Sequence, residues 1–364
     1  MKLINVCGAR PNFMKIAPLM RAYAAEAGIE PILVHTGQHY DRPMSHLFFE
    51  ELQIPEPDIN LEVGSGSHAQ QAAIIMQRFE PVVIETEADA VLVVGDVNST
   101  IACALVAVKL GVGVFHVEAG LRSFDRTMPE EINRVLTDAI SDLLFVSEPT
   151  GIENLRREGI PEEKVHFVGN VMIDTLEFNR QRAEQSRILE QLSLTPRQYV
   201  VVTMHRPASV DRPEILRGLL EAFGQIQRDL PVVFPIHPRT RKQMAEAGLD
   251  QLAGGMKQLT LLEPLGYLDF LKLMASAAVV LTDSGGIQEE TTILGVPCLT
   301  LRENTERPIT LTQGTNQLVG MDPARLLAAY RQIRSSPPPP ARRPDKWDGQ
   351  AAQRIARVIA QWKR

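Results

Sequence analysis

Asp96, Glu118 and Glu130 are three carboxylates placed where short apolar runs end or a helical stretch begins. Carboxyl groups that crowd together perturb one another's proton affinity, which suits them to general acid–base chemistry. Simpler structural roles stay open for each of them. Asp96 could cap the helix that follows it, Glu118 could pair with Arg122, and Glu130 is an acid of the kind that first helical turns favour.

Two cations follow the first apolar run of the chain. Gly8 opens a small-residue turn, Arg10 stands two residues later, and Lys15 falls in the next helical turn. Such a turn at a helix start, together with two cations, is a plausible site for an anion. The alternative is that Arg10 and Lys15 are solvated surface charges.

Further basic side chains follow apolar runs in the second half. His205 and Arg206 come after the run 199–203, and His237 comes after the run 232–236. A single histidine is more often a structural residue. Two histidines at successive strand ends favour a role in ligand binding, and we predict that His205, Arg206 and His237 contact a substrate.

Ser284, Gly285 and Gly286 form the strongest local motif of the chain. They lie between the apolar run 279–282 and a helical stretch that continues to 294. A helix that starts directly after such a turn presents unpaired backbone N–H groups and the positive end of its dipole. This arrangement predicts a phosphate-binding site.

Glu290, Arg307 and Phe270 lie near this motif in the sequence. Glu290 falls one turn inside the helix and is placed to reach ribose hydroxyls. Arg307 follows the next apolar run and adds a cation for the phosphate. Phe270 could stack on a base, although its spacing also suits the core face of an amphipathic helix.

The elements that must position these residues are short β-branched runs that alternate with helical stretches. We expect parallel strands covered by helices on both faces, because the runs are apolar throughout. Ligands of such doubly wound sheets bind at the carboxyl ends of the strands. The predicted strands are 3–6, 32–35, 90–94, 114–117, 143–146 and 165–168, then 199–203, 232–236, 259–262, 279–282 and 298–301. Helices are expected over 14–25, 99–110, 131–139, 214–228, 268–277, 287–294 and 350–362.

The length of 364 residues and the restart of the pattern predict two domains. We place the first over 1–169 together with 349–364, and the second over 170–348. The proline run 337–340 is an extended linker. The amphipathic stretch behind it is expected to return to the first domain.

Composition excludes several classes of protein. The net charge of −6, with acids and bases interspersed, argues against a nucleic-acid partner. No run is long enough to span a bilayer, and the N-terminal residues do not form a signal peptide, so we expect a cytoplasmic protein without a membrane partner. The sequence contains no metal-ligand cluster, no P-loop and no dinucleotide fingerprint.

Taken together, these motifs resemble the non-hydrolysing UDP-N-acetylglucosamine 2-epimerases over nearly the whole chain. The resemblance implies an α/β fold of two Rossmann-like domains with a deep interdomain cleft, as in the glycosyltransferase-B architecture. It implies a UDP-sugar substrate, a homodimer and no cofactor or metal. The family's catalytic carboxylates match Asp96, Glu118 and Glu130, and its catalytic or phosphate-contacting histidine matches His205. Its active-site cations match Arg10, Lys15 and Arg134, and its UDP contacts match Phe270, Ser284, Gly285, Gly286, Glu290 and Arg307.

The implied reaction eliminates UDP together with the C2 proton, forms a 2-acetamidoglucal, and adds UDP back after protonation of the other face. The sequence departs from better-known members in the short loop 123–128 and in the segment 37–44, where some bacterial members have an allosteric stretch. Relatives act on UDP-2,3-diacetamido-glucuronic acid, and Arg239 and Arg241 could suit such a carboxylated sugar.

Three other functions stay open. A glycosyltransferase of the same architecture would share the UDP site but would need an acceptor pocket. A hydrolysing epimerase would release free UDP and N-acetylmannosamine. A nucleotide-sugar sensor without activity would have no need of the three carboxylates.

Overall fold

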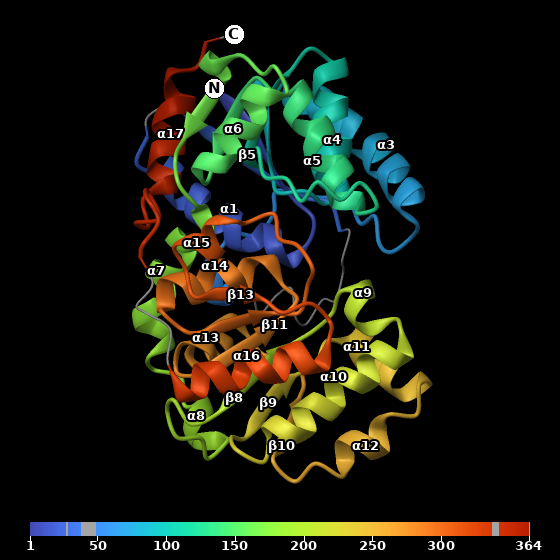
Figure 1. The fold of residues 1–364 in the computed structure, drawn as a ribbon. Helices are drawn as coiled ribbons and strands as arrows, with labels where there is room; N and C mark the ends of the chain where they lie inside the picture. Colours follow the sequence, from blue (N-terminus) through green and yellow to red (C-terminus); the bar gives the residue numbers. More distant parts are fainter. Residues whose placement is uncertain (27, 38–48, 337–341, 364) are drawn as a thin grey trace. The chain divides into compact units, whose positions relative to one another are not determined.

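The computed structural model describes residues 1–26, 28–37, 49–336 and 342–363, and within this range it leaves out the side chain of Arg10. The chain forms two compact units (Figure 1). The first unit contains Met1–Phe178 and Asp345–Arg364, and the second contains Asn179–Pro344. Each has a parallel sheet covered by helices.

The first unit is built on a seven-stranded sheet with the order β3-β2-β1-β4-β5-β6-β7. The chain reverses its direction of winding between β1 and β4, so the carboxyl ends of these central strands form a topological switch point. The strands are β1 (Lys2–Cys7), β2 (Glu30–His35), β3 (Ile59–Asn60), β4 (Ala90–Val94), β5 (Gly113–Ala119), β6 (Leu143–Val146) and β7 (Val165–Phe167). The helices are α1 (Arg10–Tyr23), α3 (His68–Thr86), α4 (Asn98–Lys109), α5 (Pro129–Ile140), α6 (Pro149–Arg157), α7 (Val171–Ala183) and α17 (Ala351–Gln361).

The second unit repeats this plan with a six-stranded sheet in the order β10-β9-β8-β11-β12-β13. Its switch point lies between β8 and β11. The strands are β8 (Val200–Thr203), β9 (Val232–Pro235), β10 (Leu259–Leu262), β11 (Val279–Thr282), β12 (Cys298–Thr300) and β13 (Asn316–Leu318). The helices are α8 (Ile188–Gln191), α9 (Pro207–Val210), α10 (Pro213–Ile226), α11 (Pro238–Glu246), α12 (Asp250–Gly254), α13 (Tyr267–Ala275), α14 (Gly285–Leu294), α15 (Ile309–Thr312) and α16 (Pro323–Ser335).

The prediction of two doubly wound parallel sheets is therefore confirmed. Strands β4, β5, β6 and β11 are buried along their whole length, which explains why β4 and β6 read as unbroken apolar runs. The polar residues of β5, His116 and Glu118, are buried with it. The cores consist of these strands and the inner faces of the helices.

The longest helix, α3, was not predicted. It contains Pro81 in its interior, which the sequence pattern treats as a helix breaker. Ser67 caps its first turn by accepting a hydrogen bond from the Gln70 amide at 3.3 Å, and Ile75 and Phe79 are fully buried. Tertiary packing and the cap together outweigh the cost of the proline. The two-residue and three-residue edge strands β3 and β13 were too short to be recognised.

The division between the units falls at Phe178/Asn179 rather than at 169/170, and at Pro344/Asp345 rather than at 348/349. The first half of α7 belongs to the first unit because its side chains bond there. Thr175 Oγ1 donates to the Met14 carbonyl at 2.5 Å. The Asp174 carboxylate accepts from the Ala351 and Ala352 amides at 3.1 and 2.7 Å. The proline run 337–340 lies outside the described residues.

Helix α17 packs against α1, and Figure 1 shows the two side by side in the first unit. Trp362, directly after α17, lies edge-on to Phe115 of β5 with 5.0 Å between ring centroids. No helix in the described parts of the chain has the length and apolar character needed to cross a bilayer.

Candidate active site

The turn between β1 and α1 brings Lys15 to the carboxyl edge of the first sheet. The Gly8 and Ala9 amides both donate to Asn12 Oδ1 at 3.1 Å, and Asn12 Nδ2 donates to the Val94 carbonyl at the end of β4. Both backbone amides therefore already have a hydrogen-bond acceptor within the protein. The charge that the turn offers comes from Lys15, and the side chain of Arg10 lies outside the described part.

Lys15 forms a buried ion pair with Glu118, so it is not a solvated surface charge. Lys15 Nζ bonds to Glu118 Oε2, and the two residues are only 5% and 7% exposed. Gly95 lies directly against the pair, because a Cβ on it would be 2.7 Å from Lys15 Nζ and 3.3 Å from Glu118 Oε2. The turn that carries Asp96 is thus in contact with both Lys15 and Glu118.

The backbone of Glu118 is strained. Its φ is +75°, in the left-handed region that L-residues avoid. The register between β5 and β6 shifts between Val117 and Ala119, so Glu118 is the extra residue of a β-bulge. Bulges of this kind redirect a side chain at functional sites, and the strain persists only where the surroundings enforce it.

A buried network that the sequence did not reveal holds this bulge. His116 Nε2 donates to the Gly95 carbonyl at 2.8 Å, and its Nδ1 lies 2.6 Å from Asp138 Oδ1. Asp138 Oδ2 accepts from the Gly120 amide at 3.0 Å and pairs with Arg122 at 2.7 Å. Burial alone would raise the pKa of Asp138, but His116 and Arg122 hold it below its usual value. The network thus fixes the backbone on both sides of Glu118.

Arg122 does not pair with Glu118, so that alternative is wrong. Its guanidinium instead bonds to Asp138 and to both oxygens of Glu158, at 2.8 and 2.6 Å. Arg122 therefore pairs with Asp138 and Glu158, which are distant from it in the sequence, and not with the nearby Glu118. Their spacing along the chain carries no signal that would have revealed this.

Asp96 pairs with Arg134, which projects from α5. Arg134 Nη1 bonds to Asp96 Oδ2, and Asn133 Nδ2 donates to the Asp96 carbonyl at 2.8 Å. The alternative role of Asp96 as a helix cap is not found, because α4 has Val97 at its N-cap and no side-chain cap. The structure thus brings together Asp96 and Arg134 and leaves the Asp96 carboxylate about a quarter exposed.

Glu130 and its neighbour Glu131 differ sharply. Glu131 is buried and accepts from the Ser123 and Phe124 amides at 2.9 Å each, and it also pairs with Arg134 at 2.7 Å. Glu130 is half-buried and has no hydrogen-bond or ion-pair partner among the described residues. It is the acid of this pair that is available for chemistry.

In the second unit, Asp283 orders the turn after β8. This buried carboxylate accepts from the His205 and Arg206 amides at 2.9 and 2.8 Å, and its other oxygen lies 3.0 Å from His205 Nδ1. Burial would raise the pKa of Asp283, but His205 and the amide hydrogen bonds lower it to about 2. His237 lies close by, with 5.5 Å between the two imidazole centroids. The two predicted histidines are thus brought together.

The predicted phosphate motif lies at the start of α14. Ser284 is its N-cap, and the helix begins at Gly285. A Cβ on Gly285 would lie 2.5 Å from Arg307 Nη1, so only glycine lets this guanidinium approach the helix start. The structure therefore brings Ser284, Gly285, Gly286 and Arg307 together at one edge, where helix dipole and cation both favour an anion.

Glu290, one turn further along α14, is buried and accepts a hydrogen bond from Tyr267 Oη at 2.9 Å. Burial raises the pKa of Glu290 to about 7. Tyr267 was not predicted as a site residue. Phe270 is half-buried on the same helix α13 as Tyr267.

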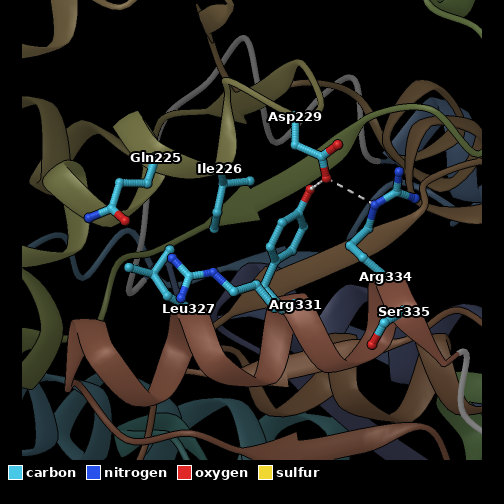
Figure 2. Close-up of a pocket in the computed structure, with 8 residues that line it drawn as sticks. Gln225, Ile226, Asp229, Leu327, Arg331, Arg334 and Ser335 are labelled. Atoms are coloured by element: carbon cyan, nitrogen blue, oxygen red, sulfur yellow. Dashed lines mark hydrogen bonds and ion pairs between the residues drawn. The ribbon is translucent and has the colours of Figure 1, made fainter.

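A separate groove of about 420 Å³ lies between α10 and α16 in the second unit (Figure 2). Figure 2 shows Asp229 bonded to Arg334, and the Tyr330 hydroxyl donates to the same carboxylate at 2.6 Å. Asp229 follows the C-terminal end of α10, which leads into β9. The groove therefore lies at the amino edge of the sheet, opposite the predicted site residues.

Two doubly wound parallel sheets of seven and six strands give the chain an α/β fold of the glycosyltransferase-B-like class. In fold, the chain is similar to sucrose-phosphate synthase from Thermosynechococcus elongatus, with a TM-score of 0.63 and 15% identity over all of this chain and 95% of that one. Residues 21–360 match the UDP-N-acetylglucosamine 2-epimerase family. The chain belongs to this family, which confirms the resemblance seen in its motifs.

Two relatives are informative. The Methanocaldococcus jannaschii UDP-N-acetylglucosamine 2-epimerase is 42% identical over 373 residues, with full coverage of both chains. Its crystal structure in complex with UDP-GlcNAc and UDP has a TM-score of 0.93. The UDP-2,3-diacetamido-2,3-dideoxy-D-glucuronate 2-epimerase of Pseudomonas aeruginosa is 41% identical over 324 residues and covers 88% of each chain.

Proposed function

We propose that this protein is an isomerase that inverts C2 of UDP-N-acetylglucosamine to give UDP-N-acetylmannosamine. Membership of the family and the full-length similarity to the M. jannaschii enzyme support this activity. The observation that carries the proposal is the arrangement at the carboxyl edge of the first sheet. There Asp96 follows β4, Glu118 lies near the end of β5, and Glu130 lies at the start of α5. Lys15 pairs with Glu118, and Arg134 pairs with Asp96.

The chemistry follows from the substrate. C2 of an N-acetylhexosamine has no adjacent carbonyl, so loss of its proton alone leaves a poorly stabilised carbanion. When the C1–O bond breaks at the same stage, the electron pair of that bond leaves with UDP. The electron pair of the C2–H bond forms the C1=C2 double bond of a 2-acetamidoglucal. Protonation of C2 on the opposite face and return of the UDP oxygen to C1 complete the inversion.

The residues divide this work by their chemistry. The carboxylates Asp96, Glu118 and Glu130 remove and return the C2 proton, and each proton transfer contributes on the order of 10²–10⁴ in rate. The start of α14, with Arg307 beside it, holds the diphosphate and stabilises the charge of the departing UDP. His205, kept in place by Asp283, donates to the same leaving group.

A carboxylated substrate is the second candidate, because the P. aeruginosa relative is almost as similar as the M. jannaschii one. Arg239 and Arg241 give it little support. Arg239 bonds to both oxygens of Asp211, and Arg241 lies 3.2 Å from Glu263. Both side chains are almost half exposed, at 44% and 45%, and among the described residues neither has a buried donor without an acceptor, in contrast to Arg206 and Arg302.

Proton NMR of the reaction in D₂O tests the function. With UDP-N-acetylglucosamine alone, we expect the manno isomer with deuterium at C2 and UDP still attached. The same assay with UDP-2,3-diacetamido-glucuronic acid compares the second candidate. Release of free UDP with N-acetylmannosamine would identify a hydrolysing epimerase. Absence of both products and of C2 exchange would contradict epimerisation and favour a transferase.

We also propose, from the family resemblance, that the protein is a homodimer. Sedimentation equilibrium tests this, and a mass equal to that of one 40.4 kDa chain would contradict it.

A further inference from the structure

Three arginines of the second unit surround one buried carboxylate. Arg302 Nη2 lies 2.7 Å from Glu306 Oε2, Arg307 Nη1 bonds to Glu306 Oε1, and Arg206 Nη2 lies 3.8 Å from the same oxygen. Glu306 is only 2% exposed. We call these four residues the arginine cluster. Neither Glu306 nor Arg302 was a predicted site residue.

The arginine cluster lies against the start of α14. A Cβ on Gly285 would be 2.5 Å from Arg307 Nη1 and 2.9 Å from Glu306 Oε1. Glu289, in the same helix, pairs with Arg307 Nε at 2.7 Å. The guanidinium of Arg307 is therefore held from two sides at the positive end of a helix dipole.

Two N–H donor groups of the arginine cluster lack a hydrogen-bond acceptor in the described part of the chain. Arg302 Nη1 and Arg206 Nε are buried and have no hydrogen-bond acceptor among the described residues. Buried donors without acceptors are costly and point to a ligand that supplies the missing oxygens. A ligand with several anionic oxygens satisfies this requirement.

The charge balance explains why an anion site contains acids. Three guanidinium groups and the carboxylates of Glu306 and Glu289 sum to a single positive charge. Without the acids, the buried arginines would repel one another and turn apart. Burial alone would raise the pKa of Glu306, but Arg307, Arg302 and Arg206 hold it well below its usual range. Glu306 thus stays ionised and keeps the cations assembled before any ligand arrives, which lowers the ordering cost of binding.

We propose that Glu306 and Arg302 are positioning residues that set the preference of this site for a diphosphate over a monophosphate. Glu306, itself held by Arg302, fixes Arg206 and Arg307 at a set spacing beside the start of α14. Two fixed guanidinium groups can bind two adjoining phosphates, whereas a monophosphate engages only part of them. This inference rests on the proposed function, which assigns UDP to the site.

Isothermal titration of the full chain with UDP and with UMP tests the proposal. The quantity of interest is the ratio of the UMP to the UDP dissociation constant. In Glu306→Gln we expect this ratio to fall by about tenfold or more, with UMP affinity changed by less than about threefold. Tighter UDP binding by Glu306→Gln would contradict positioning, because removal of a negative charge alone favours the anion.

Glu303→Gln is the matched control. Glu303 is in the same loop as Glu306, its side chain is 61% exposed, and it pairs with Arg325 at 3.4 Å. The Glu303→Gln variant should leave the ratio of the UMP to the UDP dissociation constant at the wild-type value. Arg302→Lys and Arg302→Met provide an independent route if Glu306→Gln does not fold. The ratio should fall in Arg302→Met and recover in part in Arg302→Lys.

A purely structural role predicts less folded protein with an unchanged ratio. An unchanged ratio in Glu306→Gln and Arg302→Met, with UDP still bound by the wild type, would overturn this inference alone. Failure of the wild type to bind UDP would overturn the proposed function and the inference together.

Discussion

At the scale of the residue, Glu130 and Glu131 show how burial separates two identical side chains. Glu131 accepts several hydrogen bonds and holds the loop 121–128 and Arg134 in place. Burial would raise the pKa of Glu131, but the hydrogen bonds from Ser123 and Arg134 lower it. Glu130 keeps its carboxylate available.

We therefore expect the two glutamine variants to behave in opposite ways. Glu130→Gln should lower kcat by about 10²–10⁴ without changing the melting temperature, because it removes a proton-transfer group and no contact. Glu131→Gln should lower stability by roughly 1–3 kcal/mol, because it leaves buried donors poorly satisfied. Epimerisation rates and thermal denaturation of both variants check this, and a destabilised Glu130→Gln with wild-type kcat would contradict it.

Glu290 gives a pH dependence. Its pKa rises from 4.5 to about 7 because of burial, with a further rise from nearby Glu289. The folded state therefore binds this proton more tightly than the unfolded state. The stabilising contribution is complete below pH 4.5 and is lost as the pH rises through about 7.

Between pH 5 and pH 8, the wild type should lose more stability than Glu290→Gln, whose amide does not ionise. Thermal denaturation across this range measures the difference. Tyr267→Phe, which removes only the hydroxyl that donates to Glu290, is the control for the hydrogen bond. Parallel pH profiles for the wild type and Glu290→Gln would contradict the assignment.

At the scale of the element, the end of β5 is shaped by backbone contacts. Gly120 has φ +79°, and a Cβ on it would lie 2.5 Å from the Gly151 carbonyl oxygen. Its amide also donates to Asp138. The bulge that redirects Glu118 therefore depends on the close approach of α6 to the strand end.

Gly159 offers a matched comparison, since it has the same φ of +79° and nothing within 4 Å of its Cβ position. Gly159→Ala should cost about 1–2 kcal/mol for the left-handed conformation alone. Gly120→Ala should cost more and should also lower kcat, because the carbonyl of Gly151 must move and Glu118 moves with it. Equal stability losses with unchanged kcat would show that the contact has no influence on the site.

At the scale of the whole molecule, the segment Asp345–Arg364 contributes to the core of the first unit. Trp347 is fully buried, and its Nε1 donates to the Ser147 carbonyl at 2.9 Å. Ile355 and Ile359 of α17 are fully buried as well. The first unit is thus complete only after the second has been synthesised. The interdomain cleft expected from the sequence stays a prediction.

Trp347→Ala should destabilise the first unit by about 3–5 kcal/mol, because it removes a large buried side chain. The sequence has two tryptophans, Trp347 and Trp362, both in the first unit. In the variant, fluorescence of Trp362 reports the unfolding of that unit, and circular dichroism reports both. Asp345→Ala, at an exposed position two residues away, is the control. A fluorescence transition at the wild-type temperature would contradict this prediction.

The sequence by itself determined the fold class, the family and the places where chemistry is expected. Strands β4, β6 and β11 have the predicted bounds, because strands buried on both faces are mostly apolar. The edge strand β10 also has its predicted bounds, although it is only partly buried. The site residues could be located because, in parallel sheets, residues that follow a strand lie at one edge.

Only the tertiary structure decided which side chains pair. Lys15 bonds to Glu118 across 103 residues, and Arg122 takes Asp138 and Glu158 instead of the nearby Glu118. Such pairings depend on the strand order, on a bulge and on the position of a helix, and the spacing of residues along the chain predicts none of these. For the same physical reason, the sequence did not single out His116, because its partners Asp138 and Gly95 are 22 and 21 residues away in the chain. Glu306 has Arg302 and Arg307 nearby in the sequence, and only folding adds Arg206 and buries the group.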